Sequence, residues 1–163
     1  IVKSTRFYKT HGDATAFIEV RRHFVELFKI IEQNGGAVVK TIGDAIMAVF
    51  ITPGDSLTAS ESIQKYFVAE NDKTRLRIRI SIHKGPCLAV NHNSNLDYFG
   101  TSVNFTAKLQ SMVEAGQVVF TEAIYQHPST QEFFSTRRYE ADKLDFQFES
   151  ADDIHQVFRI NVS

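Results

Sequence analysis

The order in which helical and strand-like patterns follow one another constrains the fold of this chain more than any other feature. Apolar residues recur at helical spacing after Asp13, at Phe17, Val20, Phe24, Leu27, Phe28 and Ile31. Asp13 is a plausible N-cap, and Asn34-Gly35-Gly36 stops the helical pattern. Residues 37–41 and 45–51 are short β-branched or apolar runs. Ile42-Gly43-Asp44 separates them, so a β-hairpin is predicted after the helix.

The rest of the chain repeats this mixture of patterns. A second helix is expected over residues 56–70, and strict alternation over 75–83 predicts a strand with one solvated face. Residues 91–97 are polar and turn-prone. A third helix (101–115), a short strand (118–120), a helical turn (122–126) and strands at 137–141, 146–148 and 157–162 complete the expectation. The sequence therefore predicts an α+β domain with a mostly antiparallel sheet.

Composition bounds the class of protein. A chain of 163 residues fits a single domain over residues 1–163. The net charge of −1 gives no overall attraction to nucleic acid or anionic lipid, so no nucleic-acid partner is expected. Cys87 is the single cysteine, which excludes an internal disulfide and a cysteine-based zinc site and favours a reducing compartment. The longest apolar run, Ala45–Ile51, is too short to span a membrane.

Several familiar catalytic motifs are absent from the sequence. It contains no G-x-x-x-x-G-K-[ST], G-x-G-x-x-G, H-E-x-x-H or G-x-S-x-G, and its six histidines lack metal-ligand spacing. The arginines at 75, 77 and 79 form a row that could contact phosphates, although a solvated strand face is the simpler interpretation at this net charge.

Two segments carry functional candidates, V-V-K-T-I-G-D at 38–44 and D-Y-F-G-T-S-V-N at 97–104. Read locally, Asp44 belongs to a hairpin turn and Lys40 is an exposed strand cation. An aspartate at a hairpin tip can instead present its carboxylate to a hard cation such as Mg²⁺. Likewise, Asp97 and Asn104 could merely cap a turn and the third helix.

Together, the two segments resemble a known family. Residues 38–50 (V-V-K-T-I-G-D-A-I-M-A-V-F) closely resemble the central hairpin of class III nucleotide cyclases, the adenylyl and guanylyl cyclase catalytic domain. Three further stretches, at 77–86, 97–109 and 115–121, resemble later elements of that family in the same order. The resemblance is strongest over residues 1–126. It implies a ferredoxin-like α+β sandwich of which the first strand is largely missing here.

The resemblance also implies a reaction. The family joins the ribose 3′-hydroxyl of a nucleoside triphosphate to its own α-phosphate, releasing pyrophosphate, with two divalent metal ions (Mg²⁺ or Mn²⁺) held by two aspartates. Asp44 matches the second aspartate. By this alignment the first would immediately precede Ile1, so either the chain as given omits it or the parent protein lacks it. Residues 1–5 would match the segment that wraps the triphosphate.

Further positions match the family's substrate-binding residues. Lys40 and Asp97 match the lysine and the aspartate that bind the base. Asn104 matches the asparagine that orients the ribose. Lysine donates to adenine N1 and aspartate accepts from its 6-amino group, whereas guanine reverses both roles, so ATP is the expected substrate. Lys108 stands where the family usually has an arginine that steadies the transition-state phosphate. This departure predicts reduced turnover, because lysine lacks the planar guanidinium fork with which arginine can bind two phosphate oxygens.

The family works as a two-fold dimer whose sites are shared between subunits, so a homodimer with two equivalent sites is expected. The resemblance implies a cytoplasmic location and regulatory or membrane domains fused outside this chain. A cyclase homology domain with little or no activity, serving as a nucleotide-binding or dimerisation module, is the alternative. A plain α+β interaction domain that binds a protein partner is a third reading.

Overall fold

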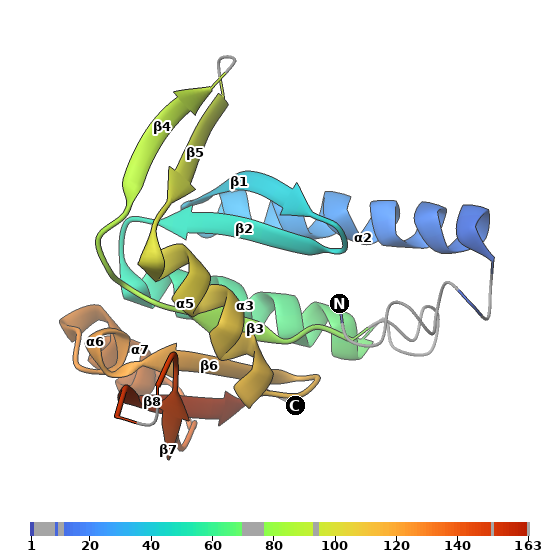
Figure 1. Ribbon diagram of the computed structural model, residues 1–163. Coiled ribbons are helices and arrows are strands. Elements are labelled where there is room, and N and C mark those ends of the chain that lie inside the picture. Colours follow the sequence, from blue (N-terminus) through green and yellow to red (C-terminus); the bar gives the residue numbers. More distant parts are fainter. Residues whose placement is uncertain (2–8, 10–11, 70–76, 93–94, 151, 163) are drawn as a thin grey trace.

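A computed structural model describes residues 1, 9, 12–69, 77–92, 95–150 and 152–162 (Figure 1). Helices and strands alternate through most of this length, as the sequence patterns predict. The elements are α2 (Asp13–Gln33), β1 (Gly36–Ile42), β2 (Ala45–Phe50), α3 (Pro53–Ala69), β3 (Ile80–Ile82), β4 (Leu88–His92), β5 (Asn95–Phe99), α5 (Thr101–Leu109), the 3₁₀ helix η1 (Gln110–Met112), β6 (Gln117–Thr121), α6 (Glu122–Tyr125), α7 (Pro128–Thr136), β7 (Asp142–Gln147) and β8 (Ile154–Asn161).

The strands form one four-stranded sheet and two separate hairpins. The sheet has the order β3-β6-β8-β7, in which β3 and β6 are parallel and the other neighbours are antiparallel. β1 and β2 form the first antiparallel hairpin, and β4 and β5 form the second, which projects from the molecule as an arm (Figure 1). The α+β class with mostly antiparallel pairing is therefore confirmed.

Alternation along the central strands gives the four-stranded sheet two buried faces. On β6, Val118 and Phe120 point to the face covered by α3, α6 and α7, whereas Val119 points to the face covered by α5. The neighbouring strand β8 alternates in the same way, with Phe158 on the first face and Val157 on the second. Because both faces carry a helix layer, the centre of β6 is a continuous apolar run, Val118–Phe120.

The β1–β2 hairpin packs on a separate cluster made with the long helix. α2 contributes Val20, Leu27 and Ile31, and α3 contributes Ile63 and Phe67. Side chains from the inner face of the hairpin complete it, at Val38, Ile46, Ala48 and Phe50. This cluster holds the hairpin against the two helices and leaves its outer face free for the site described below.

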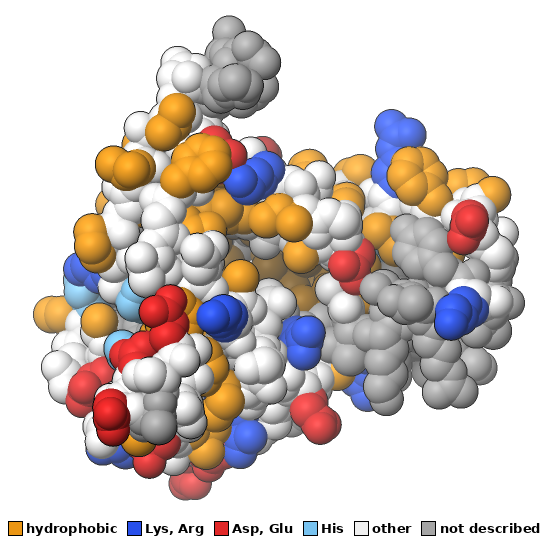
Figure 2. Space-filling model, viewed as in Figure 1, with side chains coloured by type: hydrophobic (Ala, Val, Ile, Leu, Met, Phe, Trp, Pro, Cys, Tyr) orange, Lys and Arg blue, Asp and Glu red, His pale blue; other side chains and the backbone are white. Residues whose placement is uncertain are grey.

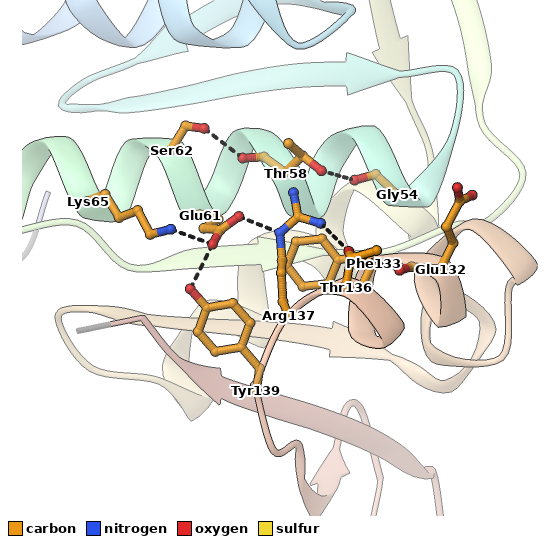
Figure 3. Close-up of polar contacts among 10 residues, drawn as sticks. All are labelled: Gly54, Thr58, Glu61, Ser62, Lys65, Glu132, Phe133, Thr136, Arg137 and Tyr139. Carbon is orange, nitrogen blue, oxygen red and sulfur yellow. Dashed lines mark hydrogen bonds and ion pairs between the residues drawn. The ribbon is translucent and has the colours of Figure 1, made fainter.

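A polar cluster ties α3 to the segment after α7 (Figure 3). The carboxylate of Glu61, only 8% exposed, accepts hydrogen bonds from Lys65 Nζ (2.6 Å), Arg137 Nε (2.6 Å) and the Tyr139 hydroxyl (2.9 Å). Burial acts to raise the pKa of Glu61, but these hydrogen bonds outweigh it, so the pKa lies below its usual value. Burial and the bond to the carboxylate raise the pKa of Tyr139 to about 12. The Arg137 guanidinium lies 4.2 Å from the centre of the Phe133 ring.

Most predicted elements are confirmed, and several details are wrong. Of the described part of the strand predicted over 75–83, only Ile80–Ile82 forms a strand, and the helix predicted over 101–115 ends at Leu109 and is followed by η1. Gly12, with a positive φ of 77°, caps α2 in place of Asp13, and α3 begins at Pro53 rather than at Ser56. The turn-prone segment 91–97 belongs mostly to β4 and β5. The strand predicted at 137–141 is not formed. A helix, α7, precedes it instead, with Pro128 at its first position and the His127 ring accepting from the Ser129 amide.

Parts of four predictions lie outside the described residues: residues 2–5 of the segment expected to wrap the triphosphate, the end of the second helix at Glu70, the start of the strand at 75–83, and residues 93–94 of the turn-prone segment. Within the described ranges, none of the helices combines the length and apolar character that a bilayer crossing requires.

Candidate functional site

The tip of the β1–β2 hairpin presents Asp44. Gly43 takes a positive φ of 60°, a conformation open to glycine at little cost, and this closes the two-residue turn. The backbone nitrogen of Ile1 donates to the Asp44 carbonyl (3.4 Å) and lies 3.5 Å from its carboxylate oxygen Oδ2. That oxygen is buried and receives no hydrogen bond of good geometry from any described residue. A buried carboxylate oxygen in this state can accept a cation.

A bulge in β1 decides which way Lys40 points. The register shifts between Val38, which pairs with Ala48, and Lys40, which pairs with Met47. Val38 and Ala48 face the α2–α3 cluster. Without the extra residue, Lys40 would share the face of Val38; the bulge instead places it on the outer face of the hairpin, opposite Met47.

On that outer face, Lys40 meets Asp97 of β5. Lys40 Nζ donates to Asp97 Oδ2 at 2.7 Å, although the two residues are 57 positions apart. The other carboxylate oxygen accepts from the backbone N–H of Tyr98 (2.7 Å), and the Lys40 ammonium lies 5.2 Å from the centre of the Phe99 ring. The two side chains are 34% and 22% exposed, so this pair of a donor and an acceptor stays accessible to a ligand.

Asn104 and Lys108 lie one helical turn apart on α5, four residues from each other, and both are exposed. Gly100 joins β5 to this helix with a φ of 132°, and its carbonyl accepts from the Val103 and Asn104 amides. The turn therefore links the Asp97 strand directly to the Asn104 helix. Lys108 Nζ lies 4.6 Å from the centre of the Phe148 ring, just beyond β7.

The structure thus brings two of the predicted residues, Lys40 and Asp97, into direct contact. Asn104 and Lys108 follow on the adjoining helix. Asp44 lies at the hairpin tip, where its polar contacts within the described part of the chain are with Ile1 and not with these four residues. Phe99 and Phe148, which contact the two lysines, were not singled out from the sequence. No local pattern marks them, because each ring meets its lysine through tertiary packing alone.

An open pocket of about 410 Å³ adjoins the base of α5. Phe105 contacts both of its histidines, with ring centres 4.7 Å from His83 and 4.8 Å from His155. Burial, and secondarily the nearby His155, lower the pKa of His83. His155 pairs with Asp153 at 2.8 Å, and His83 contacts the Thr121 hydroxyl at 3.2 Å, so both rings have polar partners.

No group of three histidine, cysteine or acidic side chains gathers closely enough, among the described residues, to hold a metal ion. A divalent ion at Asp44 would therefore need ligands from elsewhere. Mg²⁺ commonly binds through one or two carboxylates together with substrate phosphates and water, so the single buried oxygen of Asp44 is compatible with such an ion.

Comparison with known proteins gives a consistent result. Residues 1–144 match the sequence family described as the adenylate and guanylate cyclase catalytic domain. An adenylate cyclase of Anabaena cylindrica is 27% identical over 154 residues, which cover 81% of this chain and 31% of that protein. The chain spans less than a third of the length of the curated relatives that it matches.

Solved structures share the fold. An adenylate cyclase of Trypanosoma brucei, solved in its monomeric state, superposes with a TM-score of 0.82 at 20% identity, covering 99% of this chain and 85% of the other. The guanylate cyclase domain of RhGC from Catenaria anguillulae, in complex with GTP, gives 0.79 at 16% identity, covering 99% and 91%. The similar folds thus include enzymes named for both nucleotides.

Proposed function

The chain belongs to the adenylate and guanylate cyclase catalytic domain family, and from that premise we propose that it is an adenylyl cyclase domain, which converts ATP to 3′,5′-cyclic AMP and pyrophosphate. The observation that carries the proposal is the 2.7 Å pair between Lys40 and Asp97. It offers one hydrogen-bond donor and one acceptor side by side on a face that is partly open.

The choice of adenine follows from this chemistry. Lys40 can only donate and ionised Asp97 can only accept. Adenine has an acceptor at N1 next to a donor at the 6-amino group, so both protein groups find partners. Guanine has a donor at N1 and an acceptor at O6. In the same pose, the Lys40 donor would face the N1 donor and the Asp97 acceptor would face the O6 acceptor, so neither protein group would find a partner. A site built on hydrogen bonds discriminates strongly against such a mismatch.

The remaining residues take the roles that the family pattern assigns to their positions. Asn104 orients the ribose, and the Lys108 ammonium stabilises charge on the α-phosphate as the 3′-hydroxyl attacks. Asp44 holds divalent metal, supplying its buried oxygen as a ligand. Bound Mg²⁺ or Mn²⁺ would activate the hydroxyl and offset phosphate charge.

We propose that the metal pair needs a second aspartate, at the position that a residue added before Ile1 would take. The Ile1 nitrogen lies 3.5 Å from the Asp44 carboxylate, so a residue joined to that nitrogen begins beside Asp44. An Asp-extended chain, with Asp added before Ile1, should form cyclic AMP at least about a hundredfold faster than an Asn-extended chain, which keeps the shape but not the charge. Equal rates in the two would contradict this part of the proposal.

We further propose a homodimer with two shared sites in which the single domain of residues 1–163 supplies half of each. The arm supports this, because it exposes Leu88 (70%), Val90 (41%), Leu96 (52%) and Phe99 (48%). Figure 2 shows hydrophobic side chains gathered along it. Such a run of apolar surface is a typical protein interface. A cytoplasmic location and fused regulatory or membrane domains complete the proposal.

The substrate is tested by exchanging the donor and the acceptor. In the Asp-extended chain, Lys40→Glu combined with Asp97→Lys should shift the ratio of cyclic AMP to cyclic GMP formation toward cyclic GMP by at least about a hundredfold. Initial rates with equal ATP and GTP give this ratio. Lys143→Glu, at an exposed lysine of β7, is the matched control and should leave the ratio unchanged. An unaltered ratio in the exchanged variant would rule out base reading by this pair.

Shared sites are tested by mixing chains. In the Asp-extended chain, Lys40→Ala and Asp44→Ala should each abolish activity, and a mixture of the two variants should regain activity through the one intact site of the heterodimer. No recovery, once heterodimers are shown to form, would refute the shared-site arrangement.

The alternative is a cyclase homology domain with little activity. Lys108, in place of the arginine usual in the family, is the observation that favours it. This reading predicts that calorimetry detects ATP binding while no cyclic nucleotide forms, even in the Asp-extended Lys108→Arg chain.

A further inference from the structure

Phe148, the first residue after β7, lies against the ammonium group of Lys108. Lys108 Nζ is 4.6 Å from the centre of the Phe148 ring, within the range of a cation–π contact. The two residues are 40 positions apart and come from different elements. We propose that Phe148 is a positioning residue that holds Lys108 for phosphate binding, an inference that rests on the proposed cyclase function.

The Phe148 ring is itself held firmly. Its centre lies 4.9 Å from that of Phe105 and 6.4 Å from that of Phe146, both of which are buried. Its backbone N–H donates to the Asp153 carbonyl (3.0 Å), which closes the connection between β7 and β8. A side chain packed and tethered in this way offers a fixed aromatic face.

Lys108 needs such a support more than Lys40 does. It is exposed on α5, and no ion pair joins it to a carboxylate in the described part of the chain. A free lysine samples many rotamers, all of which must be given up when it binds a phosphate oxygen. The ring restricts the ammonium beforehand and so reduces this entropic cost.

The contact also leaves the charge of Lys108 available. Lys40 is paired with the Asp97 carboxylate, which suits a group that reads a neutral base. A carboxylate beside Lys108 would cancel the charge that the phosphate requires, whereas an aromatic ring attracts the cation without neutralising it. Arginine achieves a fixed geometry through its planar fork, and lysine lacks that fork. Phe148 thus compensates for part of what the substitution by lysine removes.

The contact is tested first without substrate. In ¹³C-lysine-labelled protein, the ring current of Phe148 should shift the Lys108 ε-methylene protons upfield. Phe148→Leu should abolish the shift, while Phe146→Leu, in the same cluster but without a contact to Lys108, should retain it. Lys108→Met assigns the signal. The absence of an upfield shift in the unaltered chain would overturn the proposal.

Kinetics then test the role. In the Asp-extended chain, Phe148→Leu should lower kcat for ATP about threefold to tenfold with KM changed less than about twofold, because the support acts on a group used in the transition state. Phe148→Tyr keeps the aromatic face and should restore most of kcat. Phe146→Leu should lower the thermal midpoint at least as much as Phe148→Leu does, yet leave kcat within about twofold. In a Lys108→Met background, Phe148→Leu should have no further effect.

Three results would overturn the role of Phe148 while leaving the cyclase function intact. These are an unchanged kcat in Phe148→Leu, an equal loss in Phe146→Leu, and a loss that persists in the Lys108→Met background. A chain that forms no cyclic nucleotide in any variant, with the Lys108 signal still shifted, would instead overturn the proposed function and this role with it.

Discussion

The four-stranded sheet and the two hairpins differ sharply in how completely they are buried. In the sheet, Val118, Val119 and Phe120 of β6 are 0% exposed, as is Val157 of β8. In the hairpins, by contrast, every residue of β1 and β2 is half-buried or exposed. Leu88 at the base of the arm is 70% exposed.

Three residues of the candidate site lie on the less buried hairpins. Lys40 and Asp44 lie on the first hairpin, and Asp97 lies on the arm. The proposed base-reading and metal-binding residues thus lie on the less buried hairpins, whereas Asn104 and Lys108 lie on the exposed side of α5, whose other side packs on the sheet. The sheet is buried on both faces by helices, whereas the β1–β2 hairpin is covered on its inner face alone and the arm exposes apolar side chains. Substitutions in the two regions should therefore have separable effects.

The largest effect is expected in the sheet. Phe120→Ala removes a fully buried ring that stacks near Phe158 and Tyr125, and should lower the free energy of unfolding by about 3–5 kcal/mol. Chemical denaturation followed by circular dichroism measures it. A loss below about 1 kcal/mol would show that the sheet does not carry the stability of the chain.

A smaller effect is expected on the arm, in association rather than in folding. Leu88→Asp with Val90→Asp should weaken self-association at least about tenfold, while the free energy of unfolding of the monomer changes by less than about 0.5 kcal/mol. Sedimentation over a concentration series measures the dimer. Ile51→Asp, at an apolar residue 93% exposed and outside the arm, is the matched control. If both variants associate like the unaltered chain, the arm is not the dimer surface.

The smallest effect is expected at Glu61, which joins α3 to the segment after α7. Glu61→Gln should cost about 1–2 kcal/mol of stability at pH 7, with cyclase activity at 25 °C retained. The folded-state pKa of Glu61 lies below its unfolded value, so its contribution is present above about pH 4.3 and is lost as the pH falls further.

Denaturation at pH 7 and at pH 3.5 checks this, since the difference between Glu61→Gln and the unaltered chain should shrink at the lower pH. The alkaline absorbance titration of Tyr139 should also move from about 12 back toward its ordinary pKa in the variant. A stability difference that is the same at both pH values would contradict the assigned role of the carboxylate.

Much of the fold could be read from the sequence, because periodicity and turn residues act locally. The 13–33 helix, the hairpin around Gly43 and the strand at 118–120 are confirmed. α7 was missed, since a nine-residue helix whose start is marked only by His127 and Pro128 has little periodicity to detect. The strand expected at 137–141 failed because Arg137 and Tyr139 turn toward Glu61 instead of joining the sheet.

The sequence by itself determined the order of helices and strands, the family, and the identities of Lys40, Asp44, Asp97, Asn104 and Lys108 as site candidates. Tertiary structure alone decided which of them meet. A bulge in β1, which appears only in its pairing with β2, places Lys40 on the outer face of the hairpin instead of the core face. There Lys40 donates a hydrogen bond to Asp97. Packing of the β7–β8 connection brings Phe148 to Lys108. The physical reason is that local patterns specify the conformation of a segment, whereas the direction of a side chain and its distant partners depend on strand register and on packing between segments.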